Sequence, residues 1–447
     1  MSFHTVLIAN RGEIALRVIE ACRELGLQSV CVYSEADAGM PYLWLADEAV
    51  CIGPPEPGRS YLNIASIISA AELAGAGAIH PGYGFLAENP HFVEVCEEHG
   101  LTFIGPQQSV MELLGDKVAA RKTVAEAGVP ILLGEVAPSE PGDLLEAGER
   151  VGYPLLIKAV FGGGGRGMRL VASDEDLVDR AAAASEEAKA ACGDGSLYLE
   201  RVLADPRHIE VQIAGDAMGR LVHLGERECS IQRRHQKLIE ESPAPCLSED
   251  VRDRLRQAAV WAAGAVGYQN AGTVEFLLAP DDSFYFIEMN ARIQVEHSVS
   301  EVVCGVNLIK EQILLAAGEP LSFTQEEVEP RGHAIECRIN AEDPARDFLP
   351  SCGTVEIEQL PGGHGVRLDT ALYHGMAVHP YYDSLIAKLV AWGQDREEAR
   401  LRMITALERF QLSGIETTSG LLVEILAQAE FKTGEYTTAF LERLLSG

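Results

Sequence analysis

The first hundred residues alternate short apolar segments with amphipathic ones, and this alternation constrains the fold more than any other feature. An apolar segment, TVLIA (5–9), precedes a helical pattern over 13–25, whose apolar residues share one stripe: Ile14, Val18, Cys22 and Leu25. Gly26 is placed to end that helix in the left-handed conformation, and a second apolar segment, VCVY (30–33), follows. Strand, helix and strand in this order predict a right-handed crossover in a parallel sheet.

The chain of 447 residues is too long for a single hydrophobic core, so two or three packed units are expected. We predict an N-terminal α/β domain over 1–114. Connecting helices and a small lid with a glycine-rich flap follow over 115–204. A larger unit of mixed strands and helices covers 205–447. The fold class predicted for the whole chain is α/β.

The net charge limits the expected binding partners, and the cysteines and the N-terminus indicate the cellular compartment. The formal net charge of −31 would repel nucleic acid and anionic membranes, so neither is an expected partner. None of the ten cysteines forms a C-x-x-C pair, and they are scattered through apolar segments, which predicts reduced core thiols. The N-terminus lacks an export signal and no run of about 18 apolar residues occurs, which predicts a cytoplasmic protein.

The segment 284–297 (FYFIEMNARIQVEH) has an unusual set of polar groups. Apolar and polar residues alternate over 287–296, so an extended strand would place every polar side chain on one face. Oxygen donors and a guanidinium on that face suit a divalent cation and an oxyanion, although an amphipathic edge strand is the alternative. A predicted hairpin partner strand, 272–278, adds Glu275 to Glu288 and Asn290 as a candidate magnesium site.

A glycine-rich stretch, FGGGGRGM (161–168), follows a short apolar strand that contains Lys158. Backbone N–H groups without a neighbouring Cβ can close over phosphate oxygens, and Lys158 needs an anionic partner that a phosphate would supply. Because 168–171 continues as a strand, the stretch predicts a hairpin flap rather than a Rossmann turn or a Walker loop. A flexible linker is the alternative.

Three further segments are candidates for binding. The segment 230–237 concentrates positive charge suited to an anionic ligand, and a solvated basic loop is the alternative. HPGYGF (80–85) predicts a rigid surface turn. YLERVL (198–203) reads as the edge between the small and large units, where adenine is commonly bound by backbone groups and one carboxylate.

These motifs, in order and over nearly the whole chain, closely resemble those of biotin carboxylase, an ATP-grasp enzyme. The matching segments are GEIALR (12–17), HPGYGFL (80–86), GDK (115–117), IKA with GGGGRGM (157–168), QRRHQK (232–237), FIEMNARIQVEH (286–297) and RGHAIECRINAEDP (331–344). The resemblance implies ATP-grasp architecture with a parallel, Rossmann-like N-terminal domain, a glycine-flap lid and a larger mixed α+β C-terminal domain. It also implies carboxylation of biotin, on biotin carboxyl carrier protein, from bicarbonate and ATP with Mg²⁺ or Mn²⁺.

The resemblance implies residue roles as well. ATP would contact Lys117, Lys158, Glu200, Leu203, His208, Gln232, His235 and the flap residues Gly163, Gly164 and Gly165. Magnesium would bind Glu275 and Glu288, with Asn290 nearby. Bicarbonate would bind Arg292, Gln294, the Val295 backbone and Lys237, with Glu296 as general base. Arg338 would stabilise the biotin ureido oxygen, and Tyr83 would line the biotin pocket.

Some positions depart from the family pattern. Phe161 replaces the first residue of a longer glycine run, Ala291 replaces Thr, and 298–300 reads Ser-Val-Ser where Pro-Val-Thr is usual. Glu20 and His364 occupy positions where the bacterial homodimer interface usually has a basic and an aromatic residue. A homodimer is therefore a weaker expectation than the chemistry.

The first hypothesis is the biotin carboxylase subunit of an acetyl-CoA carboxylase, because the sequence contains no Met-Lys-Met biotin-acceptor segment and no carboxyltransferase. Carrier protein and carboxyltransferase subunits would be its partners. The alternatives are a subunit of another acyl-CoA carboxylase, an ATP-grasp ligase for another carboxylate, and a nucleotide-binding regulator without chemistry. The presence of Glu296 and Arg338 argues against the last two.

Overall fold

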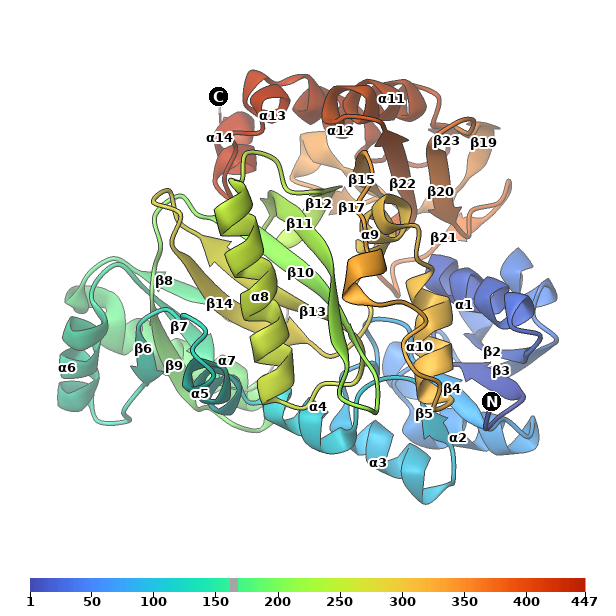
Figure 1. Cartoon of the computed structure of the whole chain (residues 1–447). Helices are drawn as coiled ribbons and strands as arrows, with labels where there is room; N and C mark the ends of the chain where they lie inside the picture. Colours follow the sequence, from blue (N-terminus) through green and yellow to red (C-terminus); the bar gives the residue numbers. More distant parts are fainter. Residues whose placement is uncertain (161–167, 447) are drawn as a thin grey trace.

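The computed structural model describes residues 1–160 and 168–446 (Figure 1). Its N-terminal part is a parallel five-stranded sheet in the order β3-β2-β1-β4-β5. The strands are β1 (Thr5–Ile8), β2 (Gln28–Ser34), β3 (Glu48–Gly53), β4 (Ala78–His80) and β5 (Thr102–Phe103). Helix α1 (Gly12–Glu24) connects β1 to β2, and Gly26 follows it with φ +70°. The predicted crossover and the left-handed glycine are therefore confirmed.

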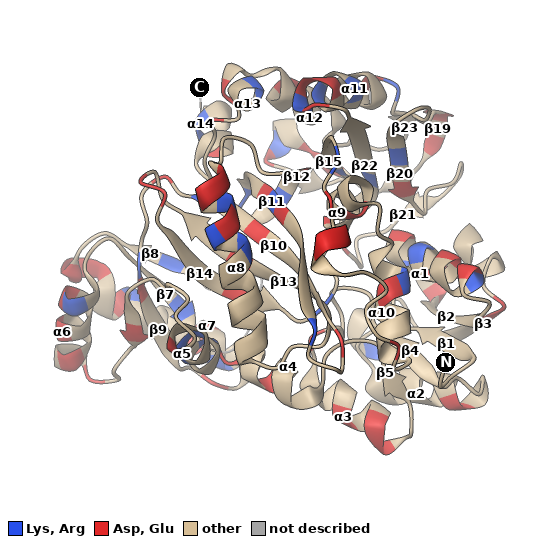
Figure 2. Cartoon of the chain, viewed as in Figure 1, with Lys and Arg blue, Asp and Glu red and all other residues tan. Residues whose placement is uncertain are grey.

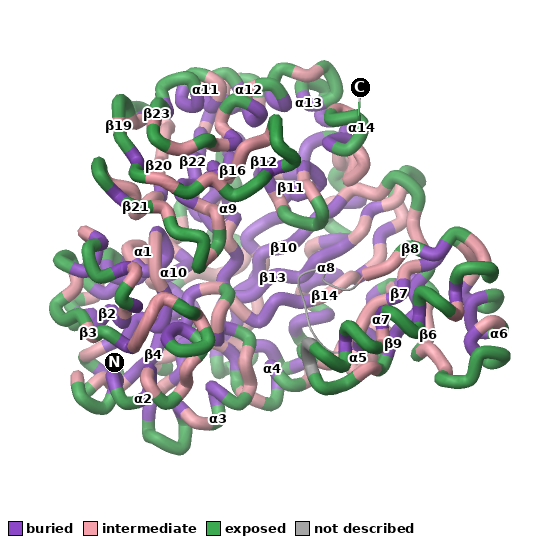
Figure 3. The backbone as a smooth tube through the Cα atoms, turned by 180° about the vertical axis from the view of Figure 1, so that it is seen from behind, coloured by how far each residue is buried: buried purple, intermediate pink, exposed green. Residues whose placement is uncertain are grey.

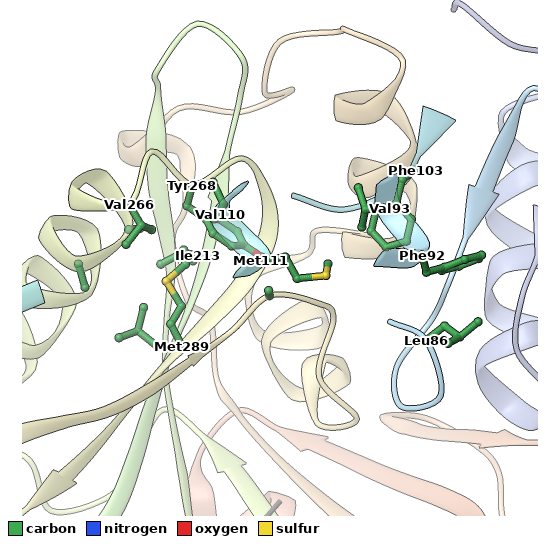
Figure 4. Packing of buried hydrophobic residues seen from close by; sticks show 14 of the residues in the cluster. Leu86, Phe92, Val93, Phe103, Val110, Met111, Ile213, Val266, Tyr268 and Met289 are labelled. Carbon is green, nitrogen blue, oxygen red and sulfur yellow. The ribbon is translucent and has the colours of Figure 1, made fainter. Parts of the chain in front are cut away.

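Four more helices follow α1 in the sequence, up to the start of the next unit: α2 (Ile64–Leu73), α3 (Pro90–Glu98), α4 (Gln108–Gly115) and α5 (Lys117–Glu126). Asp116 begins α5, because its side chain accepts hydrogen bonds from two first-turn amides. Val110 and Met111 of α4 belong to one apolar cluster that also includes Phe92 of α3 and Met289 of the large sheet (Figure 4). This shared core packs the parallel sheet unit against the large sheet.

A small antiparallel sheet forms the next unit, in the order β6-β9-β7-β8. It contains β6 (Gly134–Val136), β7 (Leu155–Ala159), β8 (Arg169–Val171) and β9 (Leu197–Arg201), and α6 (Pro141–Val151) and α7 (Leu177–Cys192) pack on it. Strands β7 and β8 pair antiparallel, as the hairpin hypothesis requires. Residues 161–167, where the flap was predicted, lie outside the described residues.

The large sheet is antiparallel and has the order β14-β13-β10-β11-β12-β15-β22-β20. Its strands are β10 (Arg207–Gly215), β11 (Leu221–Arg233), β12 (Gln236–Ser242), β13 (Asn270–Leu278), β14 (Phe284–Asn290), β15 (His333–Asn340), β20 (Val366–Thr370) and β22 (Leu385–Gly393). The predicted hairpin is confirmed as β13 and β14. Figure 3 shows the central strands buried and the surrounding loops exposed.

Helices complete the large unit. The helices are α8 (Glu249–Ala265), α9 (His297–Cys304), α10 (Leu308–Ala316), α11 (Arg396–Glu408), α12 (Ser419–Ala427), α13 (Ala429–Thr433) and α14 (Phe440–Ser446). Three two-stranded ladders lie near the C-terminal helices: β16 (Glu342–Asp343) with β17 (Leu349–Pro350), β18 (Gly353–Thr354) with β21 (Ala377–Val378), and β19 (Glu356–Gln359) with β23 (Gln411–Ser413). Within the described ranges, no helix is long and apolar enough to span a membrane.

The prediction for the cysteines is partly wrong. Five of them are buried (Cys22, Cys31, Cys96, Cys229 and Cys337), but Cys51, Cys246 and Cys352 are exposed. Apolar neighbours in sequence did not identify the exposed ones, because Cys51 lies on the edge strand β3 and the other two lie outside the strands. All nine cysteines whose side chains are described are free thiols.

Glu241 connects the large sheet to the C-terminal helices through a buried ion cluster. Its carboxylate accepts hydrogen bonds from His333 Nε2 at 2.6 Å, from Arg396 Nη2 at 2.9 Å and from the Tyr436 hydroxyl. Burial opposes its charge, but His333 and Arg396 outweigh burial and lower the pKa of Glu241 from its ordinary 4.5 to about 2. The lowered pKa contributes stability that is present above pH 4.5 and is lost as the pH falls through about 2.

Glu241→Gln is therefore expected to lower the thermal midpoint at pH 7, by the equivalent of about 3 kcal/mol. This deficit should shrink as the pH falls from about 4.5 toward 2, because the native carboxylate loses its charge over the same range. Thermal melts of both proteins across this range measure the effect. Glu424→Gln, at an exposed position on α12, is the control, and a deficit that does not change with pH would contradict the assignment.

Candidate active site

Three charged side chains meet at the large sheet, whose strands contain both acidic (red) and basic (blue) residues (Figure 2). Glu296 directly precedes α9 and is 0% exposed. Lys237 on β12 places Nζ 2.5 Å from Glu296 Oε1, and Arg338 on β15 places Nη2 2.9 Å from Glu296 Oε2. The predicted base and two predicted cations are therefore in direct contact.

These contacts keep Glu296 ionised. Burial alone would raise its pKa, but Lys237, Arg338 and Arg227 lower the pKa well below its ordinary value of 4.5. Arg338 is in turn held by Glu240, whose Oε1 lies 2.6 Å from Arg338 Nε. Burial raises the pKa of Glu240 to about 7, against the attraction of Arg338.

Lys237 is also bound by two other carboxylates. Its Nζ lies 2.5 Å from Glu210 Oε2 and 3.1 Å from Glu275 Oε1. Burial opposes the charge, yet these carboxylates and Glu296 raise the pKa of Lys237 well above its ordinary value. Glu210 was missed by the sequence reasoning, although His208, Glu210 and Gln212 occupy alternate positions of one strand and share a face.

The predicted magnesium residues lie on paired strands. Glu275 on β13 is directly opposite Glu288 on β14, and Asn290 Nδ2 donates to Glu275 at 2.9 Å. Burial and the charge of Glu275 raise the pKa of Glu288, a repulsion that a divalent cation would relieve. His208, Glu210 and Glu275 also offer ligand atoms within 4.8 Å of one another. Oxygen donors from two strands fit Mg²⁺ or Mn²⁺.

The strand β14 ends at Asn290, so the alternation over 287–296 does not continue as one extended strand. Residues 291–296 form a loop, in which Arg292 Nη1 donates to Ile293 O at 3.2 Å and His297 Nδ1 lies 2.7 Å from Gln294 O. These local bonds favour a turn over a strand. Oxygen donors therefore lie on the strand, whereas Arg292, Gln294 and Glu296 lie on the loop.

Glu88, from the N-terminal unit, holds this loop. Its Oε2 accepts from Arg292 Nε at 3.0 Å, and its Oε1 accepts from the Ala291 amide at 3.1 Å. Burial opposes the charge of Arg292, but Glu88 raises the pKa of Arg292 above its ordinary value. Sequence reasoning missed Glu88, which follows the HPGYGFL motif by two residues and carries no pattern of its own.

The predicted nucleotide residues lie on α5, on the small sheet, and on the large sheet or the turns beside it. Lys158 on β7 forms an ion pair with Glu200 on β9, and Arg121 Nη1 lies 2.6 Å from the second oxygen of Glu200. The anionic partner of Lys158 is therefore Glu200, where the sequence suggested a phosphate. Lys117 Nζ lies 3.5 Å from Ala159 O.

The remaining nucleotide residues lie on the large sheet or before it. Leu203 is half-buried between β9 and β10, His208 lies on β10, and Gln232 lies on β11. His235 lies in the turn between β11 and β12 with φ +66°. Partial burial and the charges of Lys158 and His208 lower the pKa of His235. Gly163, Gly164 and Gly165 lie outside the described residues.

The residues of the basic segment 230–237 contact two different parts of the protein. Arg233 Nη2 and Arg234 Nη2 lie 2.5 and 3.2 Å from Asp347, and Arg233 stacks 4.1 Å over the ring of Phe348. Only the later part of the segment, with Lys237, faces the cluster around Glu296. Arg233 and Arg234 therefore pair with Asp347 in this structure, and anion binding by them stays a prediction.

Tyr83 lies on the N-terminal side of the site. Its hydroxyl donates to Glu13 of α1, and Asn10 Nδ2 fixes the surrounding turn by donating to Tyr83 O at 2.8 Å. The turn predicted over 80–85 follows β4. Burial and the charge of Glu13 raise the pKa of Tyr83 well above its ordinary value.

The departures at Ala291 and at 298–300 border the site, whereas Glu20 and His364 lie where the dimer interface was expected. Ser300 Oγ accepts from Arg227 Nη1 at 3.0 Å, and Ser298 Oγ donates to Glu336. Glu20 lies 2.6 Å from Arg17 of its own chain, and His364 is exposed. Phe161 lies outside the described residues. None of the described departures removes a charged group from the cluster around Glu296.

Family models match three successive segments of the chain. They are the biotin carboxylase N-terminal domain (residues 2–111), the carbamoyl-phosphate synthase L chain ATP-binding domain (116–324) and the biotin carboxylase C-terminal domain (336–443). A Nostoc biotin carboxylase is 51% identical over 99% of this chain and 100% of its own length. A pyruvate carboxylase subunit of Methanothermobacter thermautotrophicus is 50% identical over 100% of this chain and 91% of its own length.

Solved structures agree with these matches. A biotin carboxylase from Campylobacter jejuni, in a β,γ-ATP complex, has a TM-score of 0.96 at 47% identity over 99% of both chains. The biotin carboxylase domain dimer of Hydrogenobacter thermophilus 2-oxoglutarate carboxylase, with MgADP, ADP and bicarbonate, has a TM-score of 0.96 at 48% identity over 99% and 98%. The ATP-grasp architecture predicted from the motifs is therefore confirmed. The chain belongs to the biotin carboxylase family.

Proposed function

We propose that this chain carboxylates biotin on a biotin carboxyl carrier protein, using MgATP and bicarbonate through carboxyphosphate. The observation that carries the proposal is the buried Glu296 carboxylate between Lys237 and Arg338. A buried carboxylate can accept the proton of bicarbonate, and the two cations can bind the oxyanions on either side of it. Bicarbonate is a poor electrophile, and phosphorylation supplies it with a leaving group.

In this mechanism, Arg292, Gln294, the Val295 backbone and Lys237 bind bicarbonate beside Glu296. An anion that takes Lys237 as its partner weakens the pairing that lowers the pKa of Glu296, so substrate binding makes the carboxylate a better base. Deprotonated bicarbonate then attacks the γ-phosphorus of ATP, the bond from this phosphorus to the β-phosphate oxygen breaks, and carboxyphosphate and ADP result. Carboxyphosphate breaks down to CO₂ and phosphate, the phosphate takes the proton of the biotin ureido nitrogen, and this nitrogen attacks CO₂. Arg338 stabilises the negative ureido oxygen in this step, and Tyr83 lines the biotin pocket.

We assign ATP to the space between the small and large sheets. The residues that would contact ATP are Lys117, Lys158, Glu200, His208, Gln232 and His235, and Leu203 would lie beside the adenine. Glu275 and Glu288, with Asn290 nearby, would hold Mg²⁺ or Mn²⁺, which neutralises phosphate charge when bound. The unit 115–204, with Gly163, Gly164 and Gly165, would close over the nucleotide and exclude water, between the domains 1–114 and 205–447.

The purified protein is expected to release ADP from MgATP only when bicarbonate is present, and faster when free biotin is added. A coupled ADP assay with bicarbonate-depleted buffer measures both dependences. ATP hydrolysis independent of both substrates would reject the proposal. ADP binding without hydrolysis would favour a nucleotide-binding regulator instead.

We propose acetyl-CoA as the final acceptor, with carboxyltransferase subunits as partners in fatty acid biosynthesis. A second candidate is a 2-oxo acid, because relatives at 50% and 48% identity belong to a pyruvate carboxylase and to a 2-oxoglutarate carboxylase. The carboxyltransferase that co-purifies with this chain from its own cells should be supplied with carboxylated carrier and each acceptor. Product from pyruvate or 2-oxoglutarate, and none from acetyl-CoA, would reject the first assignment.

We also propose that the chain forms a homodimer, which the Hydrogenobacter domain dimer supports. Glu20 pairs with Arg17 in its own chain, so a dimer here needs contacts other than the usual basic residue at that position. Sedimentation equilibrium measures the mass in solution. A mass of one chain at micromolar concentration would contradict the dimer.

A further inference from the structure

Lys388 is a fully buried lysine close to the site, and no step described above uses it. It lies on β22 directly opposite Arg338 of β15, and its side chain is 0% exposed. Its Nζ donates to the Val295 carbonyl at 2.8 Å. This bond joins β22 to the loop 291–296, which contains Glu296.

The charge of Lys388 is balanced from the N-terminal unit and from β20. Glu13 Oε1 lies 3.2 Å from Nζ, and Asp369 Oδ2 lies 3.7 Å from it. The same Glu13 oxygen accepts the Tyr83 hydroxyl. Tyr83, Glu13, Lys388 and the Val295 carbonyl therefore form one continuous chain of polar contacts.

An apolar side chain would fill this space at lower cost, because a buried ion pair loses several kcal/mol of hydration. The ammonium group does what an apolar group cannot do, which is to hold a loop carbonyl in place. The Val295 carbonyl belongs to the peptide whose nitrogen is that of Glu296, so fixing this peptide limits where Glu296 can point. Glu13 lies in the GEIALR motif, and the proposed mechanism assigns no role to the residues of this motif.

We propose that Lys388 is a positioning residue, which fixes the bicarbonate-binding loop through Val295 and couples it through Glu13 to Tyr83 on the biotin side. The proposal rests on the proposed function, because it assigns the loop its bicarbonate role. Lys388 contacts no reacting atom. Its effect should therefore appear in the use of bicarbonate and in the mobility of the loop.

Lys388→Met alone would leave buried carboxylates without a counter-charge, so the main variant is the charge-balanced Lys388→Met with Glu13→Gln. It is expected to raise the KM for bicarbonate by about tenfold or more, because a charged hydrogen bond to the loop is lost. The KM for ATP should stay within about twofold, since the ATP-binding residues lie on other strands. Amide hydrogen exchange over 291–296 should become faster, while exchange in β13 stays unchanged.

The matched control is Lys310→Met with Glu24→Gln, which removes a partly exposed ion pair between α10 and the same helix α1. It should leave both KM values and the loop exchange unchanged. A folded Lys388–Glu13 double variant with wild-type KM for bicarbonate and wild-type exchange overturns the proposal. A parallel rise of both KM values with a lower thermal midpoint also overturns it, because the role is then structural. If the wild-type protein shows no bicarbonate dependence, the proposed function fails, and the exchange measurement alone decides the positioning role.

Discussion

Glu296→Ala is expected to reduce kcat for bicarbonate-dependent ADP release by about 10²- to 10⁴-fold, because the proposed base is lost. The fold should persist, since each cation keeps another carboxylate: Lys237 keeps Glu210, and Arg338 keeps Glu240. The measurement is the steady-state rate at saturating ATP and bicarbonate. Turnover equal to wild type would reject Glu296 as the base.

Glu296→Gln separates the loss of the base from the loss of side-chain volume. Glutamine keeps the shape and can accept a hydrogen bond from Lys237 or Arg338, but it cannot take a proton from bicarbonate. Its kcat should be as low as that of the alanine variant, with an ADP dissociation constant close to that of wild type. A glutamine variant with recovered turnover would assign Glu296 a role in holding the cations only.

Arg227→Met is expected to destabilise the protein by about 3–5 kcal/mol, because it removes one partner of a fully buried ion pair. The guanidinium is 0% exposed, and its Nε lies 2.5 Å from Glu210 Oε1. It also bonds to Gln212, Thr273 and Ser300. Urea or thermal unfolding of the variant, compared with wild type by midpoint, measures the effect.

Two other variants calibrate this result. Arg227→Lys keeps the charge but loses the fork of donors, so its midpoint should fall between the methionine variant and wild type. Arg150→Met removes an exposed arginine that lies 2.7 Å from Glu135, and it should cost less than about 1 kcal/mol. Equal losses for the Arg227→Met and Arg150→Met variants would contradict the importance of burial.

Local patterns in the sequence predicted the helices, the strands and the chemical groups of the site. They predicted the tertiary contacts between these groups less well. The crossover around α1 and the hairpin of β13 with β14 follow from apolar spacing and turn residues, and both are present. Motif similarity, rather than spacing, identified Lys237 and Arg338, which lie on β12 and β15. The alternation over 287–296 predicted one extended strand, which is wrong because β14 ends at Asn290. Period-two spacing does not show where a strand ends.

The partners that hold the site residues could not be predicted in the same way. Glu88 is 204 positions from Arg292, and Glu13 is separated from Lys388 by almost the whole chain. A single acidic residue in a helix or loop carries no periodic signal, so only tertiary packing reveals its partner. For Lys158 the need for an anion was predicted, but Glu200 meets it from a neighbouring strand.

The site draws on all three packed units at once. Glu88 comes from the segment before α3, Lys158 from the small sheet, and Arg338 from the large sheet. Cutting the chain at the boundaries between these units would therefore not yield one fragment that binds nucleotide and another that binds bicarbonate. Separately expressed fragments would first have to re-form the apolar contact of Met111 with the large sheet, so reassembly and recovery of activity should be one event.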